Sequence, residues 1–210
     1  MHKKLILIFC LLLLCGCKQI NENNNYIDTV YNCLGYSGRT NSVALGYKYY
    51  VPKGVIKIKD YDYNQVFLID DCYLYLYVDI VSYFHGEELN DLSNNNEYYY
   101  EKINYDNKKG YILVKEDLEQ YYFTMVYNYS KIEGYVPKDK INKIITLSSI
   151  ILNSIEYNRT VIEKILEGDL GQFSEFTYEV DKPEGAGSNF SQYLEEFVQK
   201  ETGDEQLPIE

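Results

Sequence analysis

The sequence predicts an α+β fold, in which an antiparallel β-meander sheet packs against a C-terminal helix and an acidic, mostly helical tail follows. Runs rich in tyrosine and β-branched residues alternate with short polar or glycine-containing connections, as in antiparallel sheets. One long amphipathic pattern begins at Pro137 and has the spacing of a helix. After residue 158 the composition becomes strongly acidic, with 13 acidic and 4 basic residues in 159–210.

The first strands are predicted at 47–51 and 55–58, and Pro52-Lys53-Gly54 supplies the turn between them. A hairpin of residues 65–69 and 72–84 follows, with its turn at Asp70-Asp71. In its second strand, side chains alternate between an apolar face with Leu74, Leu76, Val78 and Ile80 and a second face with Tyr73, Tyr75, Tyr77 and Asp79. This pattern suits either a central strand covered on two sides or a sheet that leaves a half-solvated tyrosine face.

Three further strands are predicted at 98–105, 111–115 and 120–129, and their short connections favour a meander. Gly110 is expected to take the left-handed conformation in the first connection. The helix begins at Pro137, where a missing N–H costs nothing. Its apolar face contains Ile141, Ile144, Ile145, Ser148, Ile151, Leu152 and Ile155. A stripe this broad predicts burial against the apolar face of the sheet.

The acidic tail contains two predicted helices. The capping-box pattern from Thr160 to Glu163, with Gly168 as the stop, predicts a short helix near 160–167. A final helix is predicted to begin near Asn189, and its apolar stripe consists of Phe190, Tyr193, Leu194, Phe197 and Val198. This stripe either docks on the body of the protein or contacts a partner. The residues after Glu201 are predicted to be disordered.

The N-terminus has the pattern of a secretory signal, with a basic start at Lys3-Lys4 and an apolar run from Leu5 to Leu14. The run is shorter than the roughly 20 residues that a membrane-spanning helix needs. The stretch Leu14-Cys15-Gly16-Cys17 resembles the lipobox of bacterial lipoproteins. This resemblance implies removal of the first 16 residues, a lipid such as palmitate on Cys17, and a cell-membrane location facing outside the cytoplasm. The polar run 18–25 would then be a flexible tether.

The chain therefore divides into a signal peptide at 1–16, a tether and irregular lead-in at 17–42, an α+β domain at 43–158 and the acidic tail at 159–210. The Tyr50-Val51-Pro52-Lys53-Gly54 strand and turn, the meander and the closing helix that ends at Leu152-Asn153-Ser154-Ile155 are similar to the PsbP/DcrB-like α/β sandwich. The resemblance covers about 45–157 and implies an accessory, non-catalytic role without transferring any functional residue.

Neither the composition nor the spacing of motifs points to a nucleic-acid-binding, metal-binding or catalytic site. Without Lys3 and Lys4 the chain has 18 basic and 32 acidic residues, which argues against nucleic-acid binding. His85 lies beside Glu87 and Glu88, but a zinc site usually needs a second histidine. Asp60, Asp62 and Asn64 resemble the start of a calcium loop, yet Gln65 occupies the position that needs glycine. Cys33 and Cys72 either form a disulfide or are two small buried residues. We predict no metal, no cofactor and no catalytic residue.

Two hypotheses for function remain. In the first, the protein is a membrane-anchored, non-enzymatic interaction or accessory protein that contacts an envelope protein or glycan through Tyr73, Tyr75 and Tyr77, or through Phe190, Tyr193 and Phe197. In the second, it is a ligand-binding envelope lipoprotein, for example for carbohydrate, or a hydrolytic one. Tyrosines would then stack on sugars, and Glu87, Glu88 and Asp91 would supply carboxylates.

Overall fold

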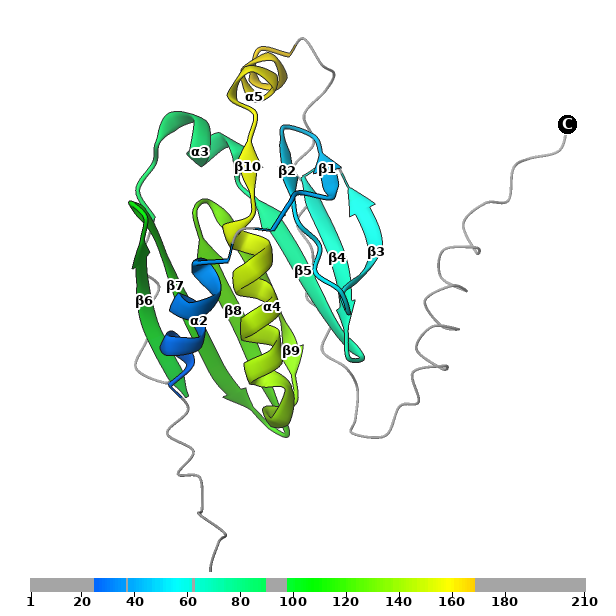
Figure 1. Cartoon of the computed structure of the whole chain (residues 1–210), viewed down its shortest axis with the longest axis vertical. Helices are drawn as coiled ribbons and strands as arrows, with labels where there is room; N and C mark the ends of the chain where they lie inside the picture. Colours follow the sequence, from blue (N-terminus) through cyan, green and yellow to red (C-terminus); the bar gives the residue numbers. More distant parts are fainter. Residues whose placement is uncertain (1–24, 37, 62, 90–97, 169–210) are drawn as a thin grey trace, which may run out of the picture.

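The predicted α+β fold is confirmed. A computed structural model describes residues 25–36, 38–61, 63–89 and 98–168. It contains a seven-stranded antiparallel sheet, a smaller three-stranded sheet and helices that include one near the C-terminal end of the described chain. Helices α2 (Tyr26–Leu34) and α4 (Ile141–Asn153) lie side by side across one face of the large sheet (Figure 1).

The large sheet is made of two meanders that meet at its centre. The first contains β3 (Ile56–Tyr61), β4 (Asn64–Ile69) and β5 (Cys72–Val78), and the second contains β6 (Tyr99–Tyr105), β7 (Lys108–Asp117), β8 (Gln120–Tyr127) and β9 (Ser130–Val136). The strand order is β3-β4-β5-β9-β8-β7-β6, so β5 pairs with β9 and β6 forms the far edge. The meander predicted from the strands 98–105, 111–115 and 120–129 is present as β6, β7 and β8, and the β5–β9 pair joins the two halves.

Three hairpins close through two-residue turns in which both residues have positive φ. The pairs are Asp70-Asp71, Asp106-Asn107 and Asn128-Tyr129, with φ between 47° and 65°. Turns of this kind match the right-handed twist of the strands, and Asp and Asn tolerate the left-handed region better than most residues. The prediction that Gly110 supplies this conformation was wrong. Gly110 lies inside β7, where a Cβ atom would be 2.1 Å from the Val126 carbonyl oxygen of β8.

Strand β9 was missed by the sequence analysis, although Ile132, Gly134 and Val136 alternate with charged and tyrosine residues as a strand requires. Gly134 lies where β9 approaches β5. A Cβ atom on it would be 2.4 Å from the Tyr73 carbonyl oxygen and 2.8 Å from Leu74 Cδ2. The residue thus permits the close backbone approach that joins the two meanders.

The core lies between the sheet and the helices on its covered face. The predicted stripe of α4 is buried there, with Ile141, Ile144, Ile145, Ile151 and Leu152 all excluded from solvent. Lys138–Lys140 form a 3₁₀ turn after Pro137, and the α-helix itself begins at Ile141. Helix α2 lies within residues 17–42, which were expected to form a tether and irregular lead-in, so that prediction was wrong for 26–34. The Asn153 side-chain amide of α4 donates to the Leu34 carbonyl oxygen at 2.8 Å.

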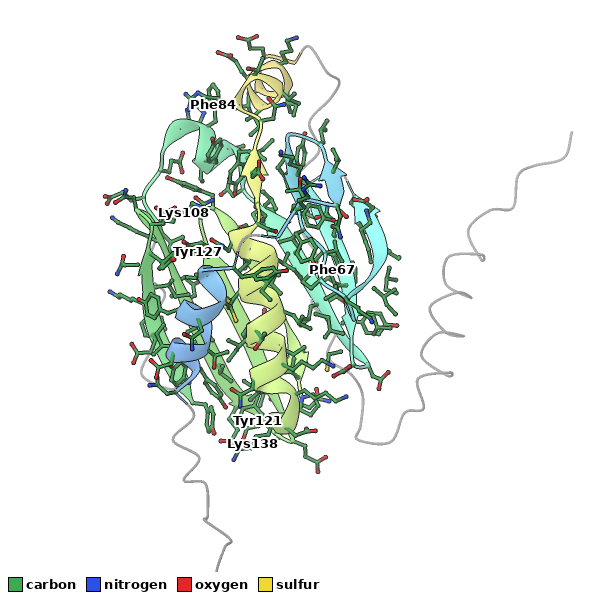
Figure 2. All side chains as sticks on the ribbon, in the orientation of Figure 1. Phe67, Phe84, Lys108, Tyr121, Tyr127 and Lys138 are labelled. Atoms are coloured by element: carbon green, nitrogen blue, oxygen red, sulfur yellow. The ribbon has the colours of Figure 1, made fainter. Side chains whose placement is uncertain are left out.

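The predicted strand 72–84 is too long, because residues 80–85 form helix α3 (Ile80–His85). Asp79 ends the strand and caps the helix, since its carboxylate accepts from Ser82 N at 2.8 Å. Gly86 closes the helix in the left-handed conformation, with φ of 68°. Phe84 of this helix lies beside the start of α5 (Figure 2), and the Arg159 guanidinium is 4.7 Å from the centre of its ring.

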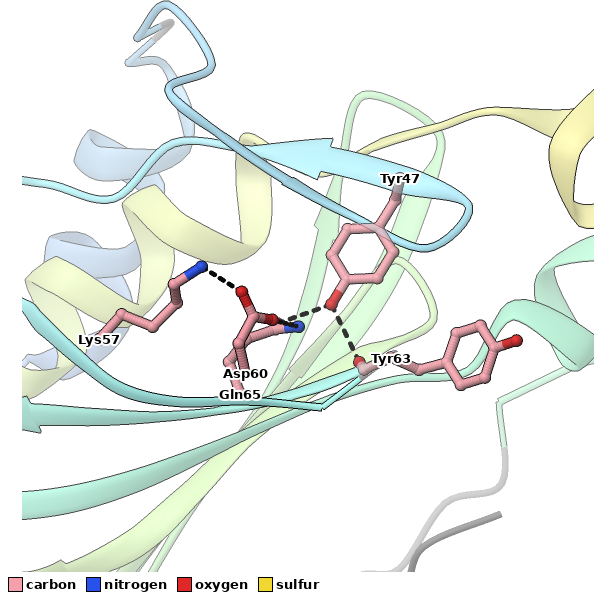
Figure 3. Close-up of polar contacts among 5 residues, drawn as sticks. All are labelled: Tyr47, Lys57, Asp60, Tyr63 and Gln65. Carbon is pink, nitrogen blue, oxygen red and sulfur yellow. Dashed lines mark hydrogen bonds and ion pairs between the residues drawn. The ribbon is translucent and has the colours of Figure 1, made fainter. Parts of the chain in front are cut away.

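The small sheet contains β1 (Ser42–Ala44), β2 (Tyr47–Tyr49) and β10 (Glu156–Tyr157), with β2 in the middle. A buried polar network connects it to the large sheet (Figure 3). The Tyr47 hydroxyl lies 2.6 Å from Gln65 Oε1 and 2.9 Å from the Tyr63 carbonyl oxygen. Gln65 Nε2 donates to Asp60 Oδ1 at 3.2 Å, and Asp60 also pairs with Lys57.

Helix α5 (Arg159–Leu166) was predicted correctly in position, but its cap was not. The side chain of Asn158, rather than that of Thr160, accepts from a backbone N–H, that of Val161, at 3.2 Å. Ile162 and Ile165 are buried, and a Cβ on Gly46 would lie 2.9 Å from Ile162 Cγ1. The helix thus packs on the body through its apolar side. None of the described helices is long and apolar enough to span a membrane.

Candidate interaction surface

The face of the large sheet opposite α2 and α4 carries a concentration of tyrosines, and we call it the tyrosine face. On β5, Tyr73, Tyr75 and Tyr77 alternate with the buried Leu74 and Leu76. The strand register places further tyrosines on the same face. Among the described strand residues, its tyrosines are Tyr61, Tyr73, Tyr75, Tyr77, Tyr100, Tyr111, Tyr122 and Tyr135. The three residues singled out from sequence thus belong to an eight-tyrosine surface built from six strands.

The tyrosine face has an aliphatic patch on each side of its central strands, β5 and β9. Val66 and Leu68 of β4 lie opposite Tyr75 and Tyr73, and Leu113 and Val126 lie on β7 and β8. Each of these four side chains is at most 8% exposed. Tyr73, Tyr75 and Tyr77 are half-buried, so their rings contribute to this apolar layer. A broad sheet surface with aromatic and aliphatic side chains is typical of a contact area for another folded surface.

A small charged network lies in the middle of this face. Glu133 of β9 accepts from the Tyr122 hydroxyl at 2.9 Å through one oxygen, and its other oxygen is 2.7 Å from Lys131 Nζ. Lys131 Nζ is also 6.0 Å from the centre of the Tyr77 ring. Burial, and secondarily the Glu133 charge, raise the pKa of Tyr122 well above its ordinary value, so the hydroxyl remains a donor. Because one Glu133 oxygen binds Tyr122 and the other binds Lys131, Glu133 is better suited to hold these two side chains in place than to act as a general base.

The residues of this network were missed in the sequence because β9 was missed. Tyr122 and Tyr135 have ring centres 5.1 Å apart, although they lie on separate strands. The alternation of Lys131, Glu133 and Tyr135 with Ile132 and Val136 was the signal that could have located them. The pairing of β9 with β5, which brings Lys131 to Tyr77, has no such local signal.

A second region of interest surrounds Glu87 and Glu88. These residues line a hollow of about 260 Å³ together with Lys109, Asn128 and Tyr129. Glu87 accepts from the Ser82 hydroxyl at 3.2 Å, and Glu88 is 4.0 Å from Lys109 Nζ at an exposed position. The hollow is smaller than the roughly 300–1,000 Å³ of most ligand pockets. Asp91, the third acid of the hydrolytic hypothesis, lies outside the described residues.

A larger groove of about 540 Å³ lies between the small sheet and the start of α5. It is lined by residues 43–48 and by Glu156, Tyr157, Asn158, Arg159 and Val161. Its charged groups are already engaged, because Lys48 Nζ is 2.9 Å from Glu156 and Arg159 contacts Phe84. The groove is thus a hollow of ligand size in which Lys48 and Glu156 form an ion pair and the Arg159 guanidinium lies over the Phe84 ring.

The remaining candidates can be placed individually. Cys33 and Cys72 are free thiols, the first half-buried and the second buried, and burial raises the pKa of the Cys72 thiol to about 11. His85 ends α3 with its ring against Phe84. Asp60 binds Lys57 and Gln65. Within the described ranges, no group of three or more Asp, Glu, His and Cys residues is arranged to hold a metal ion. Cys17, Phe190, Tyr193 and Phe197 lie outside the residues that the structure describes.

Comparison with known proteins leaves the family open. No protein-family model matches the sequence, and no curated protein matches it. The described surfaces are therefore the basis for assigning a function.

Proposed function

We propose that this protein is a lipid-anchored, extracytoplasmic interaction protein without enzyme activity, and that it binds an envelope protein through its tyrosine face. The observation that carries the proposal is the concentration of eight tyrosines, with two buried aliphatic patches among them, on one sheet face. Tyrosine offers a large contact area at low entropic cost, and its hydroxyl can bond to polar groups of a partner. Lys131 and Glu133 add a charged pair that would orient the partner.

The lipid anchor is the second part of the proposal, and it is supported by Leu14-Cys15-Gly16-Cys17. A diacylated cysteine holds a protein stably at a membrane, whereas a single chain does not. Growth with a palmitate analogue tests this part. We expect label on the wild-type protein, no label on Cys17→Ala, and release of that variant from the membrane fraction. Label on Cys17→Ala would contradict the proposed anchor.

Photocrosslinking in living cells tests the contact surface. A benzophenone amino acid replaces Tyr75 on the tyrosine face, and the control carries the same replacement at Tyr36, which is 49% exposed near the helices. We expect a specific adduct with another envelope protein from position 75 and none from position 36. In the Tyr75 probe strain, the additional change Lys131→Glu should remove the adduct, because it reverses the charge beside Tyr77. Equal adducts from both positions would refute the assignment of the surface.

The groove between the small sheet and α5 supports a weaker second candidate, which is binding of a small ligand such as an oligosaccharide. Its volume of about 540 Å³ is the specific observation in favour. Saturation-transfer NMR with neutral oligosaccharides tests it, with Val161→Trp as the variant that fills the groove. Transfer that Val161→Trp abolishes would support the second candidate, and transfer unaffected by this change would exclude the groove.

A further inference from the structure

The tyrosine face has a charge opposite to that of the whole chain. Among the described strand residues, register places five lysines and two acidic residues on this face, a net charge of +3, whereas the whole sequence has a net charge of −12. The basic residues are Lys59, Lys102, Lys109, Lys115 and Lys131, and the acidic ones are Asp117 and Glu133. A segment with acidic and aromatic side chains would complement both the lysines and the tyrosine rings of this face.

The chain itself contains such a segment directly after α5. Residues 169–210 have 11 acidic and 2 basic residues, a net charge of −9. The same 42 residues contain six aromatic side chains and the predicted apolar stripe at 190–198. The negative charge of the segment is complementary to the net positive charge of the tyrosine face, and its aromatic stripe can pack on the tyrosine rings of that face.

We propose that the segment 169–210 docks on the tyrosine face of its own chain, through the stripe of Phe190, Tyr193 and Phe197, and competes there with the protein's partner. The acidic side chains of the segment would lie near the lysines of the face, while the stripe packs on the tyrosine rings of β5 beside Val66 and Leu68. Docking accounts for the charge and the composition of the segment without reference to any partner. The competition rests on the proposed function, whereas the docking does not.

The chain is long enough for this contact. The 22 residues from Gly168 to Phe190 span up to about 70 Å when extended, at roughly 3.3 Å per residue. The longest strand, β7, has 10 residues and therefore measures about 33 Å. The extended connection is thus about twice as long as the longest strand of the face. A tethered segment of this kind has an effective concentration on the order of mM, so a free partner must bind tightly to displace it.

Photocrosslinking within the purified full chain tests the docking. The benzophenone probe at Tyr75 is activated in dilute protein without any partner, and the adducts are mapped by peptide mass spectrometry. The probe at Tyr36 is again the matched control. We expect intramolecular adducts between position 75 and peptides of 169–210, and their loss in high salt, because the contact is partly electrostatic. Adducts from position 75 only to a second copy of the chain, or to no tail peptide, would overturn the proposal.

Two full-length variants separate docking from a general loss of structure. The triple change Phe190→Ser, Tyr193→Ser, Phe197→Ser should abolish the intramolecular adduct and lower the thermal midpoint only by the lost docking energy, while the body still unfolds in one cooperative transition. The control change Phe173→Ser, outside the stripe, should leave the adduct in place. An adduct that survives the triple change would overturn the assignment of the stripe.

The same variants distinguish this inference from the proposed function. In cells, the triple change should increase the adduct between position 75 and the envelope partner, because its competitor is removed. A partner adduct that does not increase would overturn the competition even when the docking is observed. Absence of any partner adduct, together with an intact intramolecular adduct, would contradict the proposed function and leave the docking supported.

Discussion

Replacing Tyr47 by phenylalanine tests the network that joins the two sheets. The change removes one buried hydroxyl and keeps the ring, whose centre lies 5.7 Å from that of Tyr49. The hydroxyl has one proton and lies within hydrogen-bond distance of two carbonyl oxygens, those of Tyr63 and Gln65. The Gln65 amide cannot turn over to compensate, because its Nε2 faces the Asp60 carboxylate, which only accepts. The loss therefore leaves Gln65 Oε1 without its donor.

The expected cost follows from this geometry. Gln65 is fully buried, and a buried polar atom that loses its partner costs about 1–3 kcal/mol. We expect Tyr47→Phe to lower the free energy of unfolding by about 2 kcal/mol, which corresponds to roughly 4–8 °C in the midpoint of thermal unfolding for a chain of this size. Equilibrium urea unfolding is the primary measurement, and an unchanged m-value would show that the cost arises in the folded state.

A second variant identifies the partner. Gln65→Met removes the other side of the contact, so the double variant no longer contains the orphaned amide. We expect it to be at least about 1 kcal/mol more stable than the sum of the two single losses predicts. A Tyr47→Phe protein within about 0.5 kcal/mol of wild type, or two losses that add without coupling, would refute the network as the connection between the sheets.

Three further predictions concern the described residues. Burial raises the pKa of Tyr127 to about 12 and that of Tyr47 well above its ordinary value. Just above pH 10, both tyrosines are therefore still protonated in the folded protein, whereas the same residues in the unfolded chain are ionised. The stability from these groups is complete below pH 10 and falls above it, at about 1.4 kcal/mol per pH unit for each group; a urea midpoint that stays constant from pH 9 to 11.5 would be inconsistent with this. Gly134→Ala should cost about 2 kcal/mol or more, because its Cβ would overlap the backbone of β5; a thermal midpoint equal to that of wild type would disprove the close approach. Leu118→Gly should gain about 0.5–1 kcal/mol, since Leu118 is 84% exposed with φ of 57° and packing loses little; a lower urea midpoint would count against this.

Much of the fold was predictable because the signals are local. The alternation in 72–78 located β5 and its tyrosines, and the stripe from Ile141 to Leu152 located α4 and its buried side. The error at 79–84 has an equally local cause. Tyr83 and Phe84 favour strand in isolation, but the Asp79 cap and Gly86 end the strand and close a helix.

The interaction surface was only partly predictable. Tyr73, Tyr75 and Tyr77 were found from the period of two, whereas Tyr111 and Tyr122 reach the same face only through strand pairing. Likewise, the Lys131–Glu133 pair comes beside Tyr77 because β9 inserts between β5 and β8. Pairing of this kind joins segments about 55 residues apart, and no pattern within either strand specifies it.

The sequence by itself determined the α+β class, the hairpins at Asp70-Asp71 and Asp106-Asn107, and the burial side of α4. Lipid attachment at Cys17 stays a prediction from the sequence. Each of these depends on neighbouring residues, either through the period of side chains along a strand or helix or through a short motif. Only the tertiary structure decided that the two meanders join at β5 and β9, and that eight tyrosines and a net positive charge gather on one face of an acidic protein. Strand order depends on which apolar faces can be buried together, and this depends on interactions between distant segments of the chain.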